Sequence, residues 1–486
     1  MTQEETNIST LEKDLGAFRE NLGTAEASGK RKWVFAKKTK GKYTTWRDIV
    51  SAILLILLFV VPFIRVHGNP LFMFDILSRE FYIFGAYFSP TDSYLFAIGL
   101  VTTIVFVIVF TVIYGRIFCG WICPQTIFME NVFRKIEYWI EGDRNKQIRL
   151  SKQEWDSEKI RKRLLKFVIF ALLSFIISNL LFSYVIGTEA LGKLITEGPL
   201  EHFSGFIGIF VFSAAFYFIF GWFREQVCSF ICPYGRLQGV LIDKDTVNIV
   251  YDFVRGEGML GRAKWRKNED RKSLGKGDCI DCDQCVVVCP AGIDIRNGNQ
   301  LECVNCTACI DACDEVMVKI GFPTGLICYA SENMIERRTK FRFTPRIIAY
   351  TAVLCVLIGV CMSLLFIRSS VESKFLKLPG TQYEMEGADT VVDEYQFTFI
   401  NKTTDTKKLT VKIISPEKAN LKMLNYSDNS LVIKPRGFIK GVAEIRMPKA
   451  ELKREKEEIV IGTFDEQGNQ VDTYTTTFIG PFKITF

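Results

Sequence analysis

Eight cysteines between residues 279 and 313 repeat one spacing twice. The first four read C-x2-C-x2-C-x3-C and are followed by Pro290, and the second four keep this spacing with Asp314 in place of the proline. The run is typical of proteins that bind two [4Fe-4S] clusters, because three closely spaced thiolates cover one cluster while the fourth reaches the other. We therefore expect two interleaved ligand sets: Cys279, Cys282, Cys285 and Cys313 for one cluster, and Cys289, Cys303, Cys306 and Cys309 for the other.

A zinc site and a disulfide framework are the two alternative interpretations of these cysteines. Two tandem copies of a four-cysteine pattern, in a segment expected to face a reducing compartment, disfavour both alternatives. Twin clusters would make this segment an electron carrier.

A second set of cysteines follows two of the predicted membrane helices. Cys119-x3-Cys123 and Cys228-x3-Cys232 are each followed by proline, so the pattern of helix, outer loop, helix and C-x3-C-P occurs twice. The spacing places two thiols one turn apart on a helical face, and the proline favours a break there. If the two repeats pack together, the four sulfurs converge on a soft metal ion such as Cu(I) or form a redox disulfide. The alternative is that they are small buried residues at helix ends.

Membrane helices must position these cysteines. Of the 486 residues, 48% are hydrophobic and only 24% are charged, which is too apolar for one ordinary soluble fold. Five stretches reach the length of about 20 mostly apolar residues that a membrane span needs. They are Arg47–Val66, Ser93–Tyr114, Leu164–Ile186, Gly205–Phe223 and Ile347–Ile367.

Basic residues mark the side of the membrane on which each connection is expected. They concentrate at 30–42, at 116–163 and on both flanks of the cluster segment, and the positive-inside rule places these parts in the cytoplasm of a bacterial inner-membrane protein. The C-terminal segment should then be periplasmic, and it contains no cysteine. The net charge of +7 fits helix ends and anionic lipid better than nucleic acid.

The expected architecture is a five-helix transmembrane bundle with a bacterial-type 2[4Fe-4S] ferredoxin domain and an immunoglobulin-like β-sandwich. Apolar residues alternate with polar ones after the fifth helix, as in Tyr395, Phe397 and Phe399, with turn residues at short intervals. The sandwich either contacts a partner or is passive. The expected domains are a basic tail at 1–46, two helical repeats at 47–245, the ferredoxin domain at 246–345, the fifth helix at 346–368 and the sandwich at 369–486.

Other candidate residues carry weaker signals. Cys328, Cys355 and Cys361 are isolated and are expected to be core or lipid-facing residues. His67 and His202 are the two histidines of the chain and are expected near outer helix ends, as surface residues or as ligands of haem, copper or a quinone. The segment Gln125–Ile140 has the pattern of an amphipathic helix lying on the inner membrane face.

The chain resembles the cytochrome c oxidase accessory proteins of the CcoG/FixG type over nearly its whole length. The basic N-terminus, the five helices and the C-terminal domain all match. The specific motifs are FCGWICPQ at Phe118–Gln125, CSFICPYGRLQ at Cys228–Gln238 and CIDCDQCVVVCPAGIDIRNG at Cys279–Gly298. The ferredoxin run alone is shared by many electron carriers, whereas this combination is specific.

This resemblance implies a membrane-bound cupric reductase that converts Cu(II) to Cu(I) for the assembly of cbb-type oxidases. The implied partners are copper ions and copper chaperones or oxidase assembly factors. One-electron clusters and thiolates, which favour Cu(I), agree with this chemistry, and we expect Cys119, Cys123, Cys228 and Cys232 to carry the reduction. Two alternatives remain: a subunit that relays electrons from quinol to another protein, and a non-enzymatic copper or assembly scaffold.

Overall fold

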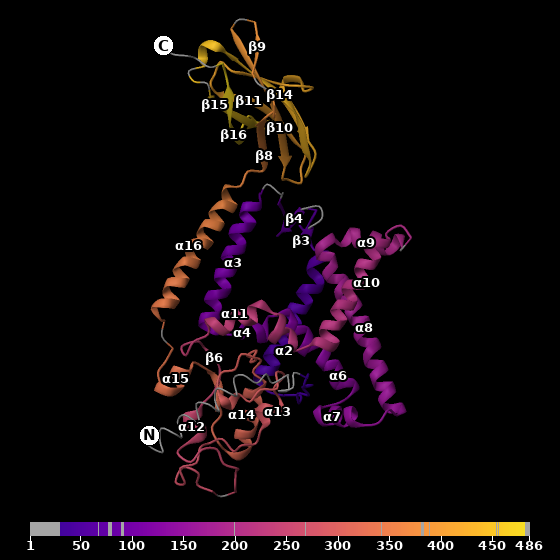
Figure 1. Cartoon of the computed structure of the whole chain (residues 1–486), viewed down its shortest axis with the longest axis vertical. Coiled ribbons are helices and arrows are strands. Elements are labelled where there is room, and N and C mark those ends of the chain that lie inside the picture. Colours follow the sequence, from indigo (N-terminus) through magenta and orange to yellow (C-terminus); the bar gives the residue numbers. More distant parts are fainter. Residues whose placement is uncertain are drawn as a thin grey trace. The chain divides into compact units, whose positions relative to one another are not determined.

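Figure 1 shows the computed structural model of the chain. It describes residues 30–481 except 67, 76–79, 89–91, 199, 268, 342, 381–382, 388, 453 and 455. Most of the predicted basic tail, and His67, therefore lie outside the described residues. The chain forms two compact units. Unit 1 comprises Met1–Val61, Gly99–Ser183 and Thr188–Ile358, and unit 2 comprises Pro62–Ile98, Tyr184–Gly187 and Gly359–Phe486.

Five helices in the described residues are long and apolar enough to cross a membrane, as predicted. They are α2 (Lys42–Val60) with η1 (Val61–Phe63), α3 (Ser93–Tyr114), α8 (Ser157–Ile186), α10 (Phe203–Tyr217) with the π-helix η4 (Phe218–Phe223), and α16 (Pro345–Ile367). The first and third helices begin at Lys42 and Ser157 rather than at Arg47 and Leu164. Charged residues form helix readily, so the apolar run marks only the membrane part of each helix.

Short helices follow the second and fourth spans and carry the C-x3-C-P motifs. After the second span come α4 (Ile117–Trp121), α5 (Pro124–Thr126), the π-helix η3 (Ile127–Phe133), α6 (Arg134–Ile140) and α7 (Arg144–Lys152). After the fourth span come the π-helix η5 (Val227–Ile231) and α11 (Pro233–Leu241). Another short helix, α9 (Thr188–Glu197), lies between the third and fourth spans. The predicted break is present, because Cys123 and Cys232 are extended and each proline begins the next helix. The second cysteine of each pair therefore lies at the break.

The ferredoxin segment is built on two short strands and two helices that carry thiols. Strand β6 (Asn248–Tyr251) pairs antiparallel with β7 (Ile327–Ala330). Between and after them lie α12 (Phe253–Glu257), α13 (Gln284–Val287), η6 (Ile295–Asn297), α14 (Ala308–Ile320) and α15 (Glu332–Arg337). Ile249, Met317 and Ile327 form a core around Cys279 and Cys285. Figure 1 shows α13 and α14 near the beginning of α2.

Unit 2 contains the predicted β-sandwich. One sheet has the order β12 (Asn420–Met423), β14 (Phe438–Pro448), β10 (Thr390–Asn401), β8 (Val371–Lys377), with β9 (Glu384–Glu386) also on β10. The other has the order β13 (Ser430–Ile433), β11 (Lys407–Ser415), β15 (Lys456–Phe464), β16 (Gln470–Ile479). All the pairings are antiparallel. Tyr395, Phe397 and Phe399 are fully buried between the sheets, so the alternation predicted the core face correctly.

The connection after the first span also belongs to unit 2 and is not a plain loop. It contains a hairpin of β1 (Arg65–Val66) and β2 (Asn69–Pro70). A second small sheet is formed by β3 (Phe72–Asp75), β4 (Glu80–Ile83) and β5 (Ala86–Phe88). Asp92, buried at the beginning of the second span, accepts hydrogen bonds from Arg368 and Lys402 and so ties this connection to the sandwich.

Candidate metal and electron-transfer site

Two small cavities in the ferredoxin segment are lined by cysteines, four in one and five in the other. One is lined by Cys279, Cys282, Cys285 and Cys313, and the other by Cys289, Cys303, Cys306 and Cys309, with Cys285 also on its wall. Burial raises the pKa of the Cys313 thiol most, followed by the nearby Cys285, Cys279 and Cys282 and then by Asp314. Cys303 and Cys306 act likewise on the pKa of Cys289. The structure thus brings together the two interleaved sets that the spacing predicts, and each set takes its fourth thiol from the other half of the run.

Left-handed residues shape the loops that carry these thiols. Asp281, Asp283, Asn305 and Thr307 have φ values of 53°, 54°, 54° and 64°. Asp and Asn tolerate this conformation better than most residues. Backbone N–H groups of this segment donate to sulfur: those of Ile293 and Ala291 to Cys289, and that of the left-handed Asn305 to Cys303. Such donors stabilise a thiolate or a sulfur bound to iron.

The chemistry of these two cavities fits iron–sulfur clusters. Burial raises the pKa of the Cys285 thiol to about 12 and that of Cys303 to about 11. Without a cation these thiols would stay protonated at neutral pH, whereas a bound metal displaces the protons. Seven of the eight cysteines are buried or half-buried and Cys282 is exposed. Four sulfurs that line one small cavity form a donor set suited to one [4Fe-4S] cluster.

Replacing Cys289 by serine should remove the cluster held with Cys303, Cys306 and Cys309 and leave the other set intact. Iron should fall from about eight to about four per chain, because each cluster holds four iron ions. Cys313→Ser should remove the other cluster instead. Each variant should therefore keep only the EPR signal of its remaining cluster, and the two signals should differ. Cys328→Ser, on β7 outside both cavities, serves as the control. Loss of the same signal in both variants would contradict the interleaved assignment.

The four C-x3-C-P cysteines also gather in one place. Cys228 is affected electrostatically by Cys123, Cys119 and Cys232, and together with burial they raise its pKa to about 12. Burial likewise raises the pKa of Cys119 to about 11, and the buried amide nitrogen of Gln238 lies 3.6 Å from the Cys119 sulfur. All four are free thiols. Because two thiols come from each repeat, the repeats pack as the partners that the sequence predicts.

A glycine in the first C-x3-C-P motif touches the ferredoxin segment. A Cβ atom at Gly120 would lie 2.5 Å from the carbonyl oxygens of both Val304 and Asn305, which stand between the ligand candidates Cys303 and Cys306. Only a residue without a side chain permits this approach. The backbone next to Cys119 therefore packs directly against the backbone beside the second four-cysteine cavity.

Hydrogen bonds hold the two parts together around this contact. Arg116 donates to the carbonyl oxygens of Leu301 and Gly235. The Arg47 guanidinium, on α2, donates to the Cys306 carbonyl at 2.6 Å. Asp311, on α14, accepts from the backbone N–H groups of Tyr43 and Thr44 at 3.1 and 2.7 Å and so caps the beginning of α2. The turn at Arg116 and the helix α2 thus fix the ferredoxin segment.

A buried network of charges joins the two repeats. Arg224 makes a bidentate pair with Glu137 at 2.7 and 2.9 Å, and Lys166 contacts the same carboxylate at 2.6 Å. Arg134 pairs with Glu225. Burial opposes ionisation of Glu137, but Arg224 and Lys166 hold its pKa down to about 2. Since Glu137 follows the first C-x3-C-P motif and Arg224 precedes the second, the pair fixes one motif relative to the other.

This network corrects the prediction for Gln125–Ile140. The segment is helical, but Arg134 and Glu137 on its predicted polar face are buried, with exposed fractions of 2% and 3%. Trp139 is instead 75% exposed. Lys166 on the third span and the residues Arg224 and Glu225 just after the fourth span pair with these charges, so the predicted polar face packs into unit 1 instead of being solvated. Periodicity alone cannot distinguish a solvated charged face from one that meets complementary buried charges.

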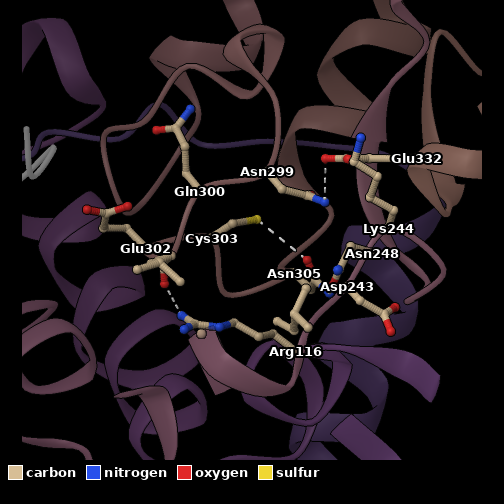
Figure 2. Close-up of a pocket in the computed structure, with 13 residues that line it drawn as sticks. Arg116, Asp243, Lys244, Asn248, Asn299, Gln300, Glu302, Cys303, Asn305 and Glu332 are labelled. Carbon is tan, nitrogen blue, oxygen red and sulfur yellow. Dashed lines mark hydrogen bonds between the residues drawn. The ribbon is translucent and has the colours of Figure 1, made fainter. Parts of the chain in front are cut away.

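A larger cavity, of about 400 Å³, opens beside Cys303. Figure 2 shows the Cys303 sulfur between Glu302 on one side and the Asn299–Glu332 pair on the other, with Arg116 below. Arg116 and Gly120 are not among the site residues predicted from the sequence. The sequence does contain a signal for Arg116. An arginine precedes the first cysteine of each C-x3-C-P motif by three or four residues: Arg116 in the first motif and Arg224 in the second.

The remaining candidates lie apart from these sites. Cys328 is half-buried on β7, and Cys355 is exposed on α16. Cys361, also on α16, is half-buried. His202 is exposed and contacts Glu197, so it is a surface residue here. His67 lies outside the described residues, and its role stays a prediction.

Family models match three parts of the chain. A 4Fe-4S dicluster domain matches residues 223–332, and a 4Fe-4S binding domain matches residues 96–147, in which Cys119 and Cys123 are the only cysteines. An "IG-like fold at C-terminal of FixG, putative oxidoreductase" matches residues 361–481. The third match agrees with the immunoglobulin-like sandwich predicted from alternation.

Three curated proteins are similar over long stretches. RdxB of Cereibacter sphaeroides is 33% identical over 81% of this chain and 84% of its own length. RdxA of the same organism is 38% identical over 63% of this chain and 64% of RdxA, just under two thirds of that protein. The nitrogen fixation protein FixG of Rhizobium meliloti is 28% identical over 92% of this chain and 93% of its own length.

Proposed function

The chain belongs to the family of FixG and the Rdx proteins and is a membrane iron–sulfur electron-transfer protein, and from that premise we propose that it reduces Cu(II) to Cu(I). Each turnover adds one electron to one Cu(II) ion, so no bond to a second substrate is needed. The Cu(I) formed would serve assembly of a cbb-type cytochrome c oxidase, with copper chaperones or oxidase assembly factors as the receiving partners.

The observation that carries the proposal is the contact of Gly120 with Val304 and Asn305. It brings the backbone of the first C-x3-C-P motif, next to Cys119, against the backbone beside the second cysteine-lined cavity. Two [4Fe-4S] clusters, held by the eight ferredoxin cysteines, would supply one-electron carriers there. Cys119, Cys123, Cys228 and Cys232 are soft ligands that bind Cu(I) better than Cu(II), so they favour the reduced product.

The surrounding residues of the chain hold this geometry. Cys123 accepts hydrogen bonds from the N–H groups of Gln125 and Thr126, where the helix begins again after the break. Gly235 lets the backbone after Cys232 approach the Cys228 carbonyl, where a Cβ atom would come within 2.6 Å. Both features keep the four sulfurs in place before a metal ion arrives, which lowers the reorganisation that binding requires.

The direct test uses Cys228→Ser in protein purified anaerobically in mild detergent. Excess Cu(II) is added to the dithionite-reduced protein after removal of the reductant, and Cu(I) is measured with a chelator while the cluster EPR signal is followed. Wild type should form Cu(I) as the clusters oxidise. Cys228→Ser should keep its iron but lose at least about tenfold in Cu(I) formation, since one of four soft ligands is missing. Cys355→Ser, exposed on α16, is the matched control.

The outcomes separate this proposal from its two alternatives. Full cluster loading with no response to Cu(II) would favour an electron relay to another protein. Copper binding without oxidation of the clusters would favour a scaffold. The proposal also places the ferredoxin segment in the cytoplasm and the sandwich in the periplasm, which labelling of single introduced cysteines in intact cells would check.

A further inference from the structure

The cavity beside Cys303 has the size of a small-molecule site. Its volume of about 400 Å³ falls within the range of ligand pockets, roughly 300 to 1,000 Å³. Its wall combines charged and amide side chains with Leu301 and Ile242. Neither the matched families nor the cluster ligation assigns a role to this cavity.

One buried donor in the cavity wall lacks a partner. Arg116 is 5% exposed, and two of its nitrogens donate to the Leu301 and Gly235 carbonyls, but its Nε has no hydrogen-bond partner among the described residues. A buried guanidinium N–H without an acceptor is costly. A ligand with an acceptor oxygen in this cavity would satisfy it.

Two carboxylates lie on opposite sides of the Cys303 sulfur. Figure 2 shows Glu302 on one side, and on the other Glu332, which accepts a hydrogen bond from Asn299 at 3.1 Å. A molecule between them would have a proton acceptor near each end and a ligand candidate for the second cluster near its middle.

The cavity is also close to the membrane surface. Arg116 comes two residues after the end of the second span, Gly239 lies in the last turn of α11, and Ile242 directly follows that helix. The same helix exposes Leu237 and Val240, with exposed fractions of 45% and 82%, as expected of a helix that contacts lipid. Leu301, 61% exposed, lies at the mouth against Gly239. A lipid-soluble molecule therefore has an apolar approach to a polar cavity.

We propose that this cavity binds the headgroup of a membrane quinol, which donates electrons at Cys303. The proposal deepens the proposed function, because it names the class of electron donor and needs the clusters to be present. Oxidation of one quinol to quinone releases two protons and two electrons. Glu302 and Glu332 accept the protons, and one electron goes to each of the two loaded four-cysteine sites.

The chemistry favours a quinol over a nicotinamide. A nicotinamide gives both electrons together as hydride, which normally requires a flavin between it and one-electron carriers. A quinol can give its electrons singly. It also has an oxygen that could accept a hydrogen bond from the unpaired Arg116 Nε. A protein donor would need an exposed surface near the cluster rather than a cavity of small-molecule size.

The test measures binding first and electron transfer second, on the full chain loaded with clusters in lipid nanodiscs. The binding probe is a redox-inert heptyl-hydroxyquinoline N-oxide, followed by quenching of its fluorescence. Wild type should bind it saturably at one site per chain. Glu302→Gln and Glu332→Gln should each bind about tenfold more weakly, since each loses a charged hydrogen-bond partner. Glu315→Gln, exposed on α14, is the matched control.

A short-chain naphthoquinol should then bleach the oxidised clusters of wild type, and the probe should block this reaction. No saturable binding by wild type, or equal binding by all three variants, would overturn the proposal. So would cluster reduction by NADPH or a soluble ferredoxin with none by the quinol. Dithionite-reduced protein should still form Cu(I) in every variant, so failure here and failure of the proposed function are distinguishable.

Discussion

Replacing Gly120 by alanine should uncouple Cu(II) reduction from the iron–sulfur sites while both stay assembled. The new Cβ atom would stand 2.5 Å from two backbone carbonyl oxygens, at Val304 and Asn305, and neither can move without shifting Cys303 or Cys306. The ferredoxin segment must therefore retreat from the C-x3-C-P thiols. Electron transfer falls steeply with distance, so Cu(I) formation from the reduced protein should slow by at least about tenfold, equivalent to about 1.4 kcal/mol in the barrier.

The measurement is the single-turnover rate of cluster oxidation by Cu(II), with iron content determined on the same sample. Gly208→Ala is the matched control, because its Cβ atom, on α10, would meet nothing within 4 Å. Unchanged rates in Gly120→Ala would show that the two sites need no close backbone contact. If iron were lost as well, the contact would be needed for assembly, and the uncoupling prediction would be wrong.

Glu137→Gln should destabilise unit 1 by about 3 to 5 kcal/mol, the usual result of removing one partner from a buried ion pair. Arg224 has an exposed fraction of 2%, and Lys166 shares the same carboxylate, so both cations lose their main partner. Thermal unfolding of the detergent-solubilised protein measures the effect. Glu158→Gln is the control, because its pair with Lys162 is solvent-exposed and should matter little.

The same pair predicts a dependence on pH. The folded pKa of Glu137 is about 2, below the usual value of 4.5, so its contribution is complete above about pH 4.5 and is lost as the pH falls towards 2. The difference in melting temperature between wild type and Glu137→Gln should shrink over this window. A constant difference would mean that packing, rather than charge, accounts for the loss of stability.

Local features of the sequence predicted much of this protein. The spacing of eight cysteines predicted which four would line each cavity, because a cluster admits few chain geometries. Apolar length predicted five spans, since a membrane sets a minimum run. Alternation predicted that Tyr395, Phe397 and Phe399 face one core, because strand side chains alternate between faces.

The tertiary structure decided how these parts meet. No local sequence pattern predicts that Gly120 packs against Val304, since the two residues are far apart in the chain. The sequence predicted a solvated polar face for Gln125–Ile140, but in the structure Glu137 forms a buried ion pair with Arg224 of the other repeat. The cavity at Cys303 exists only where a turn after one span, the end of α11 and the ferredoxin loop come together. Sequence spacing fixes chemistry within one segment, whereas contacts between segments depend on packing that no local pattern encodes.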